Sequence, residues 1–275
     1  MSSSISTAVT APVVIGTGAG DYSSPLDVTS SGSVKPAYAS GDIGVYSAYT
    51  GAQLKNSGTI DGGSGASDVP GGYGGDAVEF KAAGTIKNYA HIVGGHGYEG
   101  GGNGGAGVSL ASGTLDSYGG NTTGGIKGGE GYASANFGGT GVYIGSGTLN
   151  NGNATYYGST IEGGNGTGGA GGGTGVVLEG AGTLNNAVGS ALLGGYGAAG
   201  GGAGGIGVLL KASGTLNNNG FPCRRILQDG RGWDRRRGRF QCSHLQHRQH
   251  HRWHGRRGFS KRWRSRHSER ERLLK

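Results

Sequence analysis

The acidic side chains that could take part in catalysis are scattered along the first 220 residues. Asp61, Glu130, Glu162 and Glu179 each stand alone among glycine, polar and apolar residues. Cleavage of a glycosidic bond needs two carboxyl groups that flank the bond, one as general acid and the other as base or nucleophile. The sequence suggests no such pair. We therefore expect no catalytic residue and interpret each acid as part of a solvated strand face.

Two glycine-containing motifs could bind a cofactor or a metal ion. Gly16-Thr17-Gly18-Ala19-Gly20 follows an apolar run, as in a dinucleotide fingerprint, but no helix is predicted after it. Gly71-Gly72-Tyr73-Gly74-Gly75-Asp76 comes near a calcium-binding nonapeptide once and is not repeated. His91 and His96 are single residues in variable positions. With 68 glycines in the chain such matches arise by chance, so we expect neither cofactor-binding nor metal-ligating residues.

Residues 221–275 differ in composition from the rest and suggest two binding functions. They carry 18 basic and 4 acidic residues, a net charge of +14, whereas residues 1–220 carry 6 and 12, a net charge of −6. Arginine clusters such as 235–239, with Trp233, Trp253 and Trp263 between them, favour nucleic-acid binding through counter-charge and base stacking. Cys242 and a group of histidines favour binding of a transition metal ion. These histidines are His244, His247, His250, His251 and His254.

A third interpretation of residues 221–275 is translation out of frame. A tract of the glycine codon GGC read out of frame contains CGG, an arginine codon, so a slip in a glycine-rich repeat produces an arginine-rich tail. Shifted by one base, the codons of residues 244–246 can encode Thr-Phe-Asn, and those from residue 250 onward can encode Ile-Thr-Gly-Gly-Thr-Gly-Gly. Position 245 then lies 29 residues after Leu216, within the repeat period. We predict a disordered, out-of-frame tail, which the nucleotide sequence would test.

A repeat unit organises residues 44–220. It is clearest at 205–218, where a Gly-flanked Val-x-apolar triplet precedes Gly-Thr-Leu-x-Asn. An aliphatic residue closely followed by Gly-Gly, and then a long glycine run, complete the unit. Its leucine position recurs after 32, 29, 34, 35 and 32 residues, a period typical of solenoids. The leucine position holds Leu54, Ile86, Leu115, Leu149, Leu184 and Leu216.

Each repeat is predicted to contain three short strands. The Val-x-apolar triplet, Thr-Leu-x-Asn and the aliphatic residue before Gly-Gly have the alternation of strands with one buried face. Helix is disfavoured because each glycine costs a helix about 1 kcal/mol. Three strands per unit form one coil of a parallel β-helix, with the leucine positions stacked in the core and an asparagine ladder at a corner. The ladder positions are Asn56, Asn88, Ser117, Asn151, Asn186 and Asn218.

The sequence leaves two questions open. The first concerns the glycine runs at 100–107, 168–175 and 200–207. Because glycine loses much entropy on folding, one interpretation is that they form extended, partly disordered loops. The alternative is a packed layer in which backbones approach closely. The tyrosines between Tyr46 and Tyr196 mostly lie beside turns or glycine runs. They form either an exposed adhesive surface or a cover over bare backbone.

Composition divides the chain into three segments. Residues 1–43, rich in Ser, Thr and Ala, are expected to form a lead-in or cap; residues 44–220 hold the repeats, and residues 221–275 the basic tail. The N-terminal residues lack the charged and apolar regions of a secretory signal, and no apolar run is long enough to span a membrane. Residues 1–220 contain no cysteine, so we expect no disulfide framework in the repeats.

The order Gly-Val-x-Leu, Gly-Thr-Leu-x-Asn, Thr-Ile-x-Gly-Gly resembles the passenger region of bacterial autotransporter and filamentous adhesin-like surface proteins over residues 44–220. The resemblance implies a right-handed parallel β-helix at the cell surface or secreted, although a frame break near residue 220 would leave a truncated product in the cytoplasm. It implies a non-enzymatic structural or adhesive protein without cofactors. Its partners would be host or neighbouring-cell surfaces, polysaccharide or further copies of itself. The alternatives are a polysaccharide-acting β-helix enzyme and nucleic-acid binding through the tail.

Overall fold

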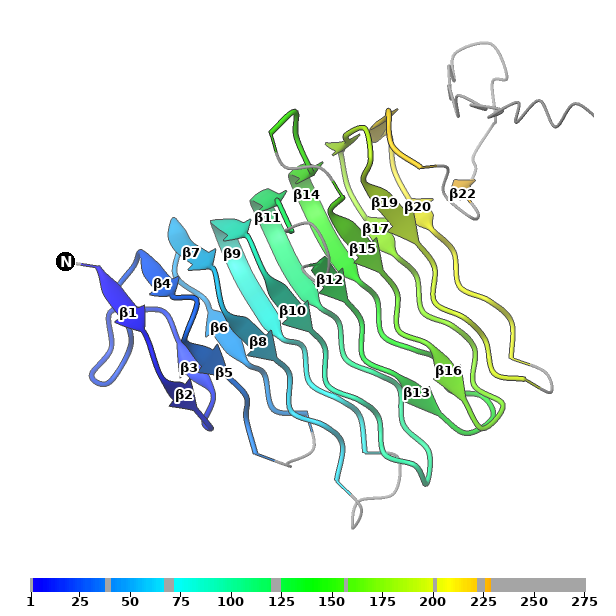
Figure 1. Cartoon of the computed structure of the whole chain (residues 1–275), viewed down its shortest axis with the longest axis horizontal. Helices are drawn as coiled ribbons and strands as arrows, with labels where there is room; N and C mark the ends of the chain where they lie inside the picture. Colours follow the sequence, from blue (N-terminus) through cyan, green and yellow to red (C-terminus); the bar gives the residue numbers. More distant parts are fainter. Residues whose placement is uncertain are drawn as a thin grey trace, which may run out of the picture. The chain divides into compact units, whose positions relative to one another are not determined.

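The computed structural model describes residues 2–37, 41–66, 72–119, 125–155, 158–199 and 202–221, together with the strand at 226–228. In this part of the chain there is no helix, and all pairs of named strands are parallel, stacked in a solenoid of about six turns (Figure 1). The predicted all-β parallel β-helix is confirmed. These residues belong to a unit that spans Met1–Ser243; a second unit, His244–Lys275, lies outside the described residues.

The Val-x-apolar triplets build one side of each turn, called here the first face. The outer residues of a triplet are buried and the middle one is half-buried, as in Val45–Ser47, except that Val177 of the triplet 176–178 is also buried. Adjacent triplets pair in register, with Val142 opposite Val108 and Val176. The strands are β3 (Val13–Val14), β6 (Val45–Ser47), β17 (Val176–Leu178), β20 (Val208–Leu210) and β22 (Ile226–Gln228), and the first halves of β9 (Val78–Asn88), β11 (Val108–Ser117) and β14 (Val142–Asn151).

The Thr-Leu-x-Asn elements build the second face. In β11 and β14 the chain passes from the first to the second face without leaving the strand, through Gly113 and Gly147. Their φ angles of 117° and 115° lie where only glycine avoids strain. The other strands of this face are β1 (Ser3–Ile5), β4 (Leu26–Val28), β7 (Ala52–Asn56), the second half of β9, β18 (Gly182–Asn186) and β21 (Thr215–Asn218).

The aliphatic residues that precede Gly-Gly build the third face, a separate seven-stranded parallel sheet. Each three-residue strand buries its central residue, as Ile92 and Ile161 do. The strands are β2 (Ala8–Val9), β5 (Ser33–Val34), β8 (Thr59–Asp61), β10 (His91–Val93), β12 (Gly125–Lys127), β15 (Thr160–Glu162) and β19 (Ala191–Leu193). A further pair, β13 (Gly131–Tyr132) and β16 (Gly166–Thr167), lies outside these sheets.

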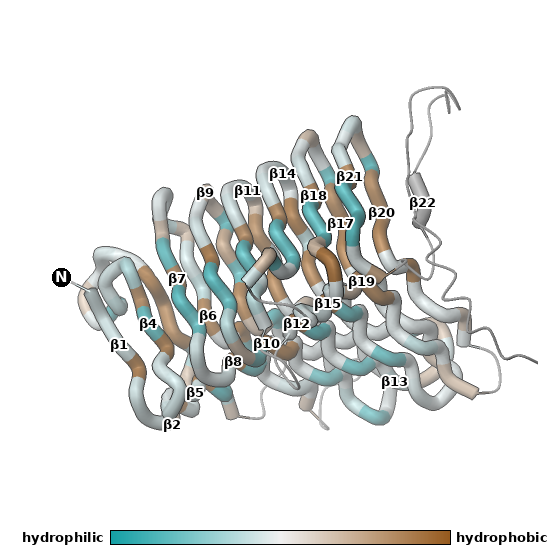
Figure 2. The backbone as a smooth tube through the Cα atoms, turned by 45° about the horizontal axis from the view of Figure 1, so that its top comes forward, coloured by the Kyte–Doolittle hydropathy of each residue, from teal (hydrophilic) through white to brown (hydrophobic). Residues whose placement is uncertain are grey.

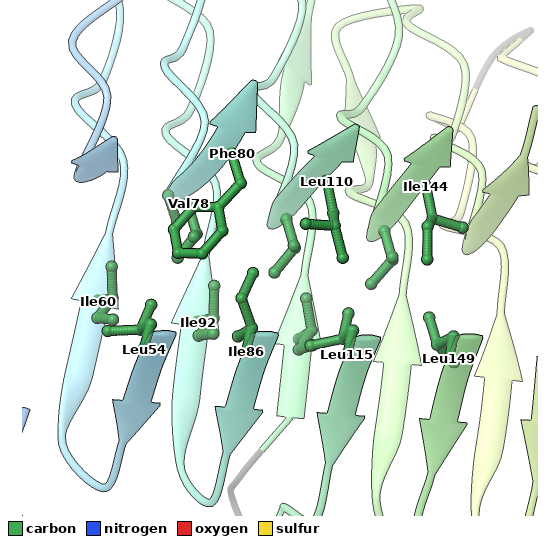
Figure 3. Close-up of a cluster of buried hydrophobic side chains, with 14 of the residues drawn as sticks. Leu54, Ile60, Val78, Phe80, Ile86, Ile92, Leu110, Leu115, Ile144 and Leu149 are labelled. Atoms are coloured by element: carbon green, nitrogen blue, oxygen red, sulfur yellow. The ribbon is translucent and has the colours of Figure 1, made fainter. Parts of the chain in front are cut away.

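The three faces enclose a continuous aliphatic core. In Figure 3, Leu115 and Ile92 point toward Leu110 and the other side chains of the first face. The predicted leucine stack is confirmed from Leu54 to Leu184, with exposed fractions of 2% or less, whereas its last member, Leu216, is half-buried. Full burial of such a side chain contributes about 1.5–3 kcal/mol. No single turn can enclose its own core, so each depends on the turns above and below it.

The solenoid extends into residues 1–43, which the sequence set apart as a lead-in or cap. Leu26 of β4 pairs with Leu54 of β7 and is fully buried, so it occupies the leucine position of an earlier turn. Val34 of β5 likewise lies opposite Ile60 on the third face. This atypical turn escapes the repeat pattern because Leu-Asp-Val replaces Thr-Leu-x-Asn.

The glycine runs and the Gly-Gly before them form the rest of each turn, called here the glycine half. Its extended segments run side by side below the three faces in Figure 1. The N–H of Gly95 donates to the carbonyl of Gly75 in the preceding turn, and the N–H of Gly105 donates across its own turn to the carbonyl of Gly95, each at 2.8 Å. Nine such bonds of 2.7–2.9 Å link successive glycines through the stack. In order they are Gly63, Gly75, Gly95, Gly105, Gly129, Gly139, Gly164, Gly173, Gly195 and Gly205.

The hydrogen bonds of the glycine half repeat every three residues. Gly94 donates to Lys127 in the next turn, Gly95 donates to Gly75 in the preceding turn, and Gly97 donates again to the next turn, to Glu130. A period of three residues is that of the polyproline II helix, which forms no hydrogen bond within itself. Apart from local turns such as that from Gly101 to Tyr98, the backbone hydrogen bonds of the glycine half therefore connect neighbouring segments.

Side chains have no room between these segments. A Cβ atom on Gly129 or Gly164 would lie closer than 3.0 Å to a carbonyl oxygen of a neighbouring turn. Real Cβ atoms do not approach backbone atoms so closely. For the described residues, the glycine runs therefore form a packed layer and not extended loops.

Polar side chains cap the N–H groups at the outer surface of the glycine half. Asn103 Oδ1 accepts from the N–H of Phe137 in the next turn at 2.8 Å, and Asn165 Oδ1 accepts from Tyr196 at 2.9 Å. His96 uses Nδ1 in the same way. These single polar residues among glycines thus satisfy backbone groups that no strand partner reaches.

The described residues contain no helix long and apolar enough to cross a membrane.

Candidate contact surface

The second face presents two columns of polar side chains to solvent. Because Leu149 of β14 points into the core, its neighbours Thr148 and Asn150 point outward. Figure 2 shows hydrophilic stretches on β18 and β21, two strands of this face. The threonine column consists of Thr85, Thr114, Thr148, Thr183 and Thr215. The amide column consists of Asn150, Asn185 and Asn217 and begins at the carboxylate of Asp116, which is buried; the two columns together are called the Thr-Asn face.

Hydrogen bonds along the stack hold the amide column in place. Asn150 Nδ2 donates to Asp116 Oδ1 at 2.7 Å, Asn185 Nδ2 to Asn150 Oδ1 at 2.8 Å, and Asn217 Nδ2 to Asn185 Oδ1 at 2.8 Å. Each amide is thereby fixed by its neighbours, so the outward groups repeat with the spacing of the strands. The sequence prediction missed this column. Period-two alternation around the buried leucine was the signal that could have found it.

A second asparagine ladder lies inside the corner, as predicted from the motif. Asn151 Nδ2 donates to Asn186 Oδ1 at 2.8 Å, and Asn186 Nδ2 to Asn218 Oδ1 at 2.7 Å. Ser117 takes the place of an asparagine and interrupts the ladder. Its hydroxyl lies 3.0 Å from that of Ser159 instead of bonding to a neighbouring asparagine of the ladder. The Oδ1 atom of Asn151, next to the interruption, has no hydrogen-bond partner. The earlier rungs are Asn56 and Asn88, joined at 2.8 Å.

Charges are concentrated at the N-terminal end of the second face. Lys55 lies 2.8 Å from Asp27, and this hydrogen bond together with the attraction of the carboxylate raises the pKa of the lysine. Lys87 follows in the same outward column. From the strand of Asn150 onward, both outward columns are uncharged as far as the structure describes them.

The acids considered as catalytic candidates are not brought together. Asp61 pairs with Lys35 at 3.3 Å, and Glu179 with Lys211 at 2.9 Å. The other two are Glu130, on the glycine half, and Glu162, on β15 of the third face. Within the described ranges, no three His, Cys, Asp or Glu side chains are grouped as metal ligands would be.

The two glycine motifs have structural roles. Asp76 Oδ1 accepts the N–H of Ala106 at 2.7 Å, another cap of the glycine half. Burial raises the pKa of Asp76, and the hydrogen bond partly opposes this shift. Gly71, the first residue of that motif, lies outside the described residues. In the other motif, Gly18 donates its N–H to Asp21 at 2.8 Å in a turn that no helix follows.

The tyrosines are divided between the two arrangements considered for them. Tyr49, Tyr73 and Tyr196 are exposed, whereas the rings of Tyr89 and Tyr118 contact each other with centroids 5.1 Å apart. Tyr156 and Tyr157 lie outside the described residues. Aromatic cover over backbone is clearest at Phe137, whose ring occupies the space that a Cβ on Gly171 would need.

The residues proposed to bind nucleic acid or a metal ion, in 229–275, lie outside the described residues, and so does most of the predicted out-of-frame tail. The chain matches no protein-family model, and searches of curated proteins and of solved structures likewise find no match.

Proposed function

We propose that the chain is a non-enzymatic structural repeat protein that adheres to other surfaces through the Thr-Asn face. The observation that carries this proposal is the pair of in-register columns, which repeat a hydroxyl and an amide on the three successive turns of β14, β18 and β21. Adjacent parallel strands are roughly 4.8 Å apart. A surface that repeats one weak contact at this interval can bind a repetitive partner through many contacts at once.

Rigidity supports the same function. The outward amides are bonded to one another, and the threonines are β-branched and lie on paired strands. Binding therefore orders few side chains, and the entropy cost per contact is low. Family resemblance points in the same direction, since the repeat is similar to that of adhesin-like surface proteins.

Adhesion can be tested with beads coated with the full chain. Adhesion would be measured on films of cellulose, chitin and alginate, on mica, and on a layer of the same protein. We expect adhesion to at least one surface and its loss in Thr148→Lys/Thr183→Lys, because long charged side chains then interrupt both neighbouring turns. Thr160→Lys is the matched control, since Thr160 is half-buried on the third face at a comparable level of the stack.

Two outcomes would contradict the proposal. Equal adhesion by the variant and the wild-type chain would show that another surface is responsible. Release of new reducing ends from the polysaccharide films would instead support the alternative of a β-helix enzyme.

A further inference from the structure

We propose that the partner of the Thr-Asn face is ice. This inference rests on the proposed function, because it names the surface to which the same two columns adhere. The spacing of the threonine column, the chemistry of the outward groups and the absence of charge on the last described turns of the two columns support it.

The spacing of the threonine column is close to a repeat of the ice lattice. Hydrogen-bonded oxygen atoms lie about 2.75 Å apart, and tetrahedral bonding then places second-neighbour oxygens of ice roughly 4.5 Å apart. Threonine hydroxyls on neighbouring strands repeat at roughly 4.8 Å. Between Thr114 and Thr215, three intervals apart in register, the mismatch accumulates to only about 1 Å. Successive hydroxyls can therefore occupy successive positions of one row of the lattice.

The exposed groups resemble the partner chemically. A threonine hydroxyl donates one hydrogen bond and accepts others, as a lattice water does, and its methyl group limits the directions from which water approaches. Thr148, Thr183 and Thr215 supply these groups on adjacent strands. Beside them the amides of Asn185 and Asn217 are already oriented by their mutual hydrogen bond.

The charge distribution favours ice over ionic partners. Ice carries no net charge, and dehydrating an ionised side chain against it would be costly. From the strand of Thr148 to that of Asn217 the two columns contain no charged residue. These columns also contain no aromatic side chain on which a sugar ring could stack, which favours ice over polysaccharide.

The test is partition of the full chain into slowly growing ice. We expect wild-type protein to become enriched in the ice fraction and to separate the freezing point from the melting point. Thr148→Lys/Thr183→Lys should abolish both effects, whereas Thr160→Lys on the third face should leave both unchanged. Far-UV circular dichroism would verify folding. Thr148→Val/Thr183→Val, which keeps the shape and removes the hydroxyls, provides a second variant and should weaken enrichment.

The possible results separate this inference from the adhesive function. Exclusion of the wild-type chain from ice, with bead adhesion that still depends on Thr148 and Thr183, would overturn ice as the partner and leave adhesion standing. Failure of both assays would overturn both proposals. Enrichment of the lysine variant to the wild-type level would show that a different face binds ice and would overturn the assignment to the Thr-Asn face.

Discussion

The two halves of each turn are packed in opposite ways. In the apolar half, three strands bury side chains such as Leu149, Ile161 and Val142, with at most 1% of each exposed. In the glycine half, segments that contain Gly139 and Gly164 touch through their backbones and bond directly at 2.8 Å. One half therefore needs side-chain volume, and the other needs its absence.

The two halves are also stabilised by different interactions. Burial of aliphatic area stabilises the apolar half, whereas the glycine half has almost no side chains to bury and loses more chain entropy on folding. Its stabilisation comes from hydrogen bonds, each contributing about 0.5–1.5 kcal/mol net. The glycine half therefore depends on the apolar half to hold its segments together.

Adding one carbon atom to the glycine half should have the largest effect. Gly164→Ala places a Cβ closer than 3.0 Å to the carbonyl oxygen of Gly129. Overpacking costs about 1–3 kcal/mol, and separating the segments also breaks bonds worth about 1 kcal/mol each. We expect a loss of about 4 kcal/mol in the free energy of unfolding, measured by urea denaturation.

A neighbouring pair of glycines provides the control. A Cβ on Gly204 would meet nothing closer than the carbonyl oxygen of Gly195 at 3.8 Å, whereas one on Gly205 would clash with Gly173. Gly204→Ala should be nearly neutral and Gly205→Ala destabilising. Equal effects of the two would contradict backbone packing of this half.

Removing volume from the apolar half should have the next largest effect. Leu149→Ala leaves a cavity in the leucine stack, and such changes cost about 2–5 kcal/mol; we expect about 3 kcal/mol by the same denaturation measurement. Leu209→Ala, at a half-buried outward position of the first face, should cost about 1 kcal/mol. If Leu149→Ala destabilises more than Gly164→Ala, the ranking of the two halves is wrong.

The inner and outer asparagines of one strand allow a finer comparison. Asn186 is buried and bonded to both neighbours in its ladder, so Asn186→Ala should cost about 1–3 kcal/mol by leaving those groups unsatisfied. Asn185→Ala, one residue away in the outer column, should change stability by less than about 0.5 kcal/mol. A decrease of similar size in the melting temperature of both variants would contradict the separate roles of the two ladders.

The smallest predicted effect concerns pH. Burial raises the pKa of Asp76 above its ordinary value of 3.8, so the folded state binds the proton more tightly than the unfolded state. The stabilisation is complete below the unfolded pKa and is lost as the pH rises through the folded pKa. Asp76→Asn keeps an acceptor for the N–H of Ala106 and should remove this decline. A stability difference between wild type and variant that does not change with pH would contradict the assignment.

Much of the apolar half could be predicted from the order of residues. Period-two alternation predicted the strands, and the recurring leucine predicted the stack that runs from Leu54 to Leu184. Leu26 was missed because its flanking residues differ from the motif, although strand pairing places it in the same column. The outward columns were missed because only the Leu and Asn of the Thr-Leu-x-Asn motif were given a structural role. The threonine and the variable residue of the motif were given none.

The sequence by itself determined that this chain folds as stacked parallel coils, because apolar residues with a fixed period can be buried only against equivalent residues of neighbouring turns. Only the tertiary structure decided what the glycines do. Glycine carries no side chain whose polarity or size could show its surroundings, so a glycine in a loop and a glycine in a packed layer look alike in sequence. They differ in the partner of the backbone N–H, as the bond from Gly164 to Gly139 shows, and that partner lies in a different segment of the chain.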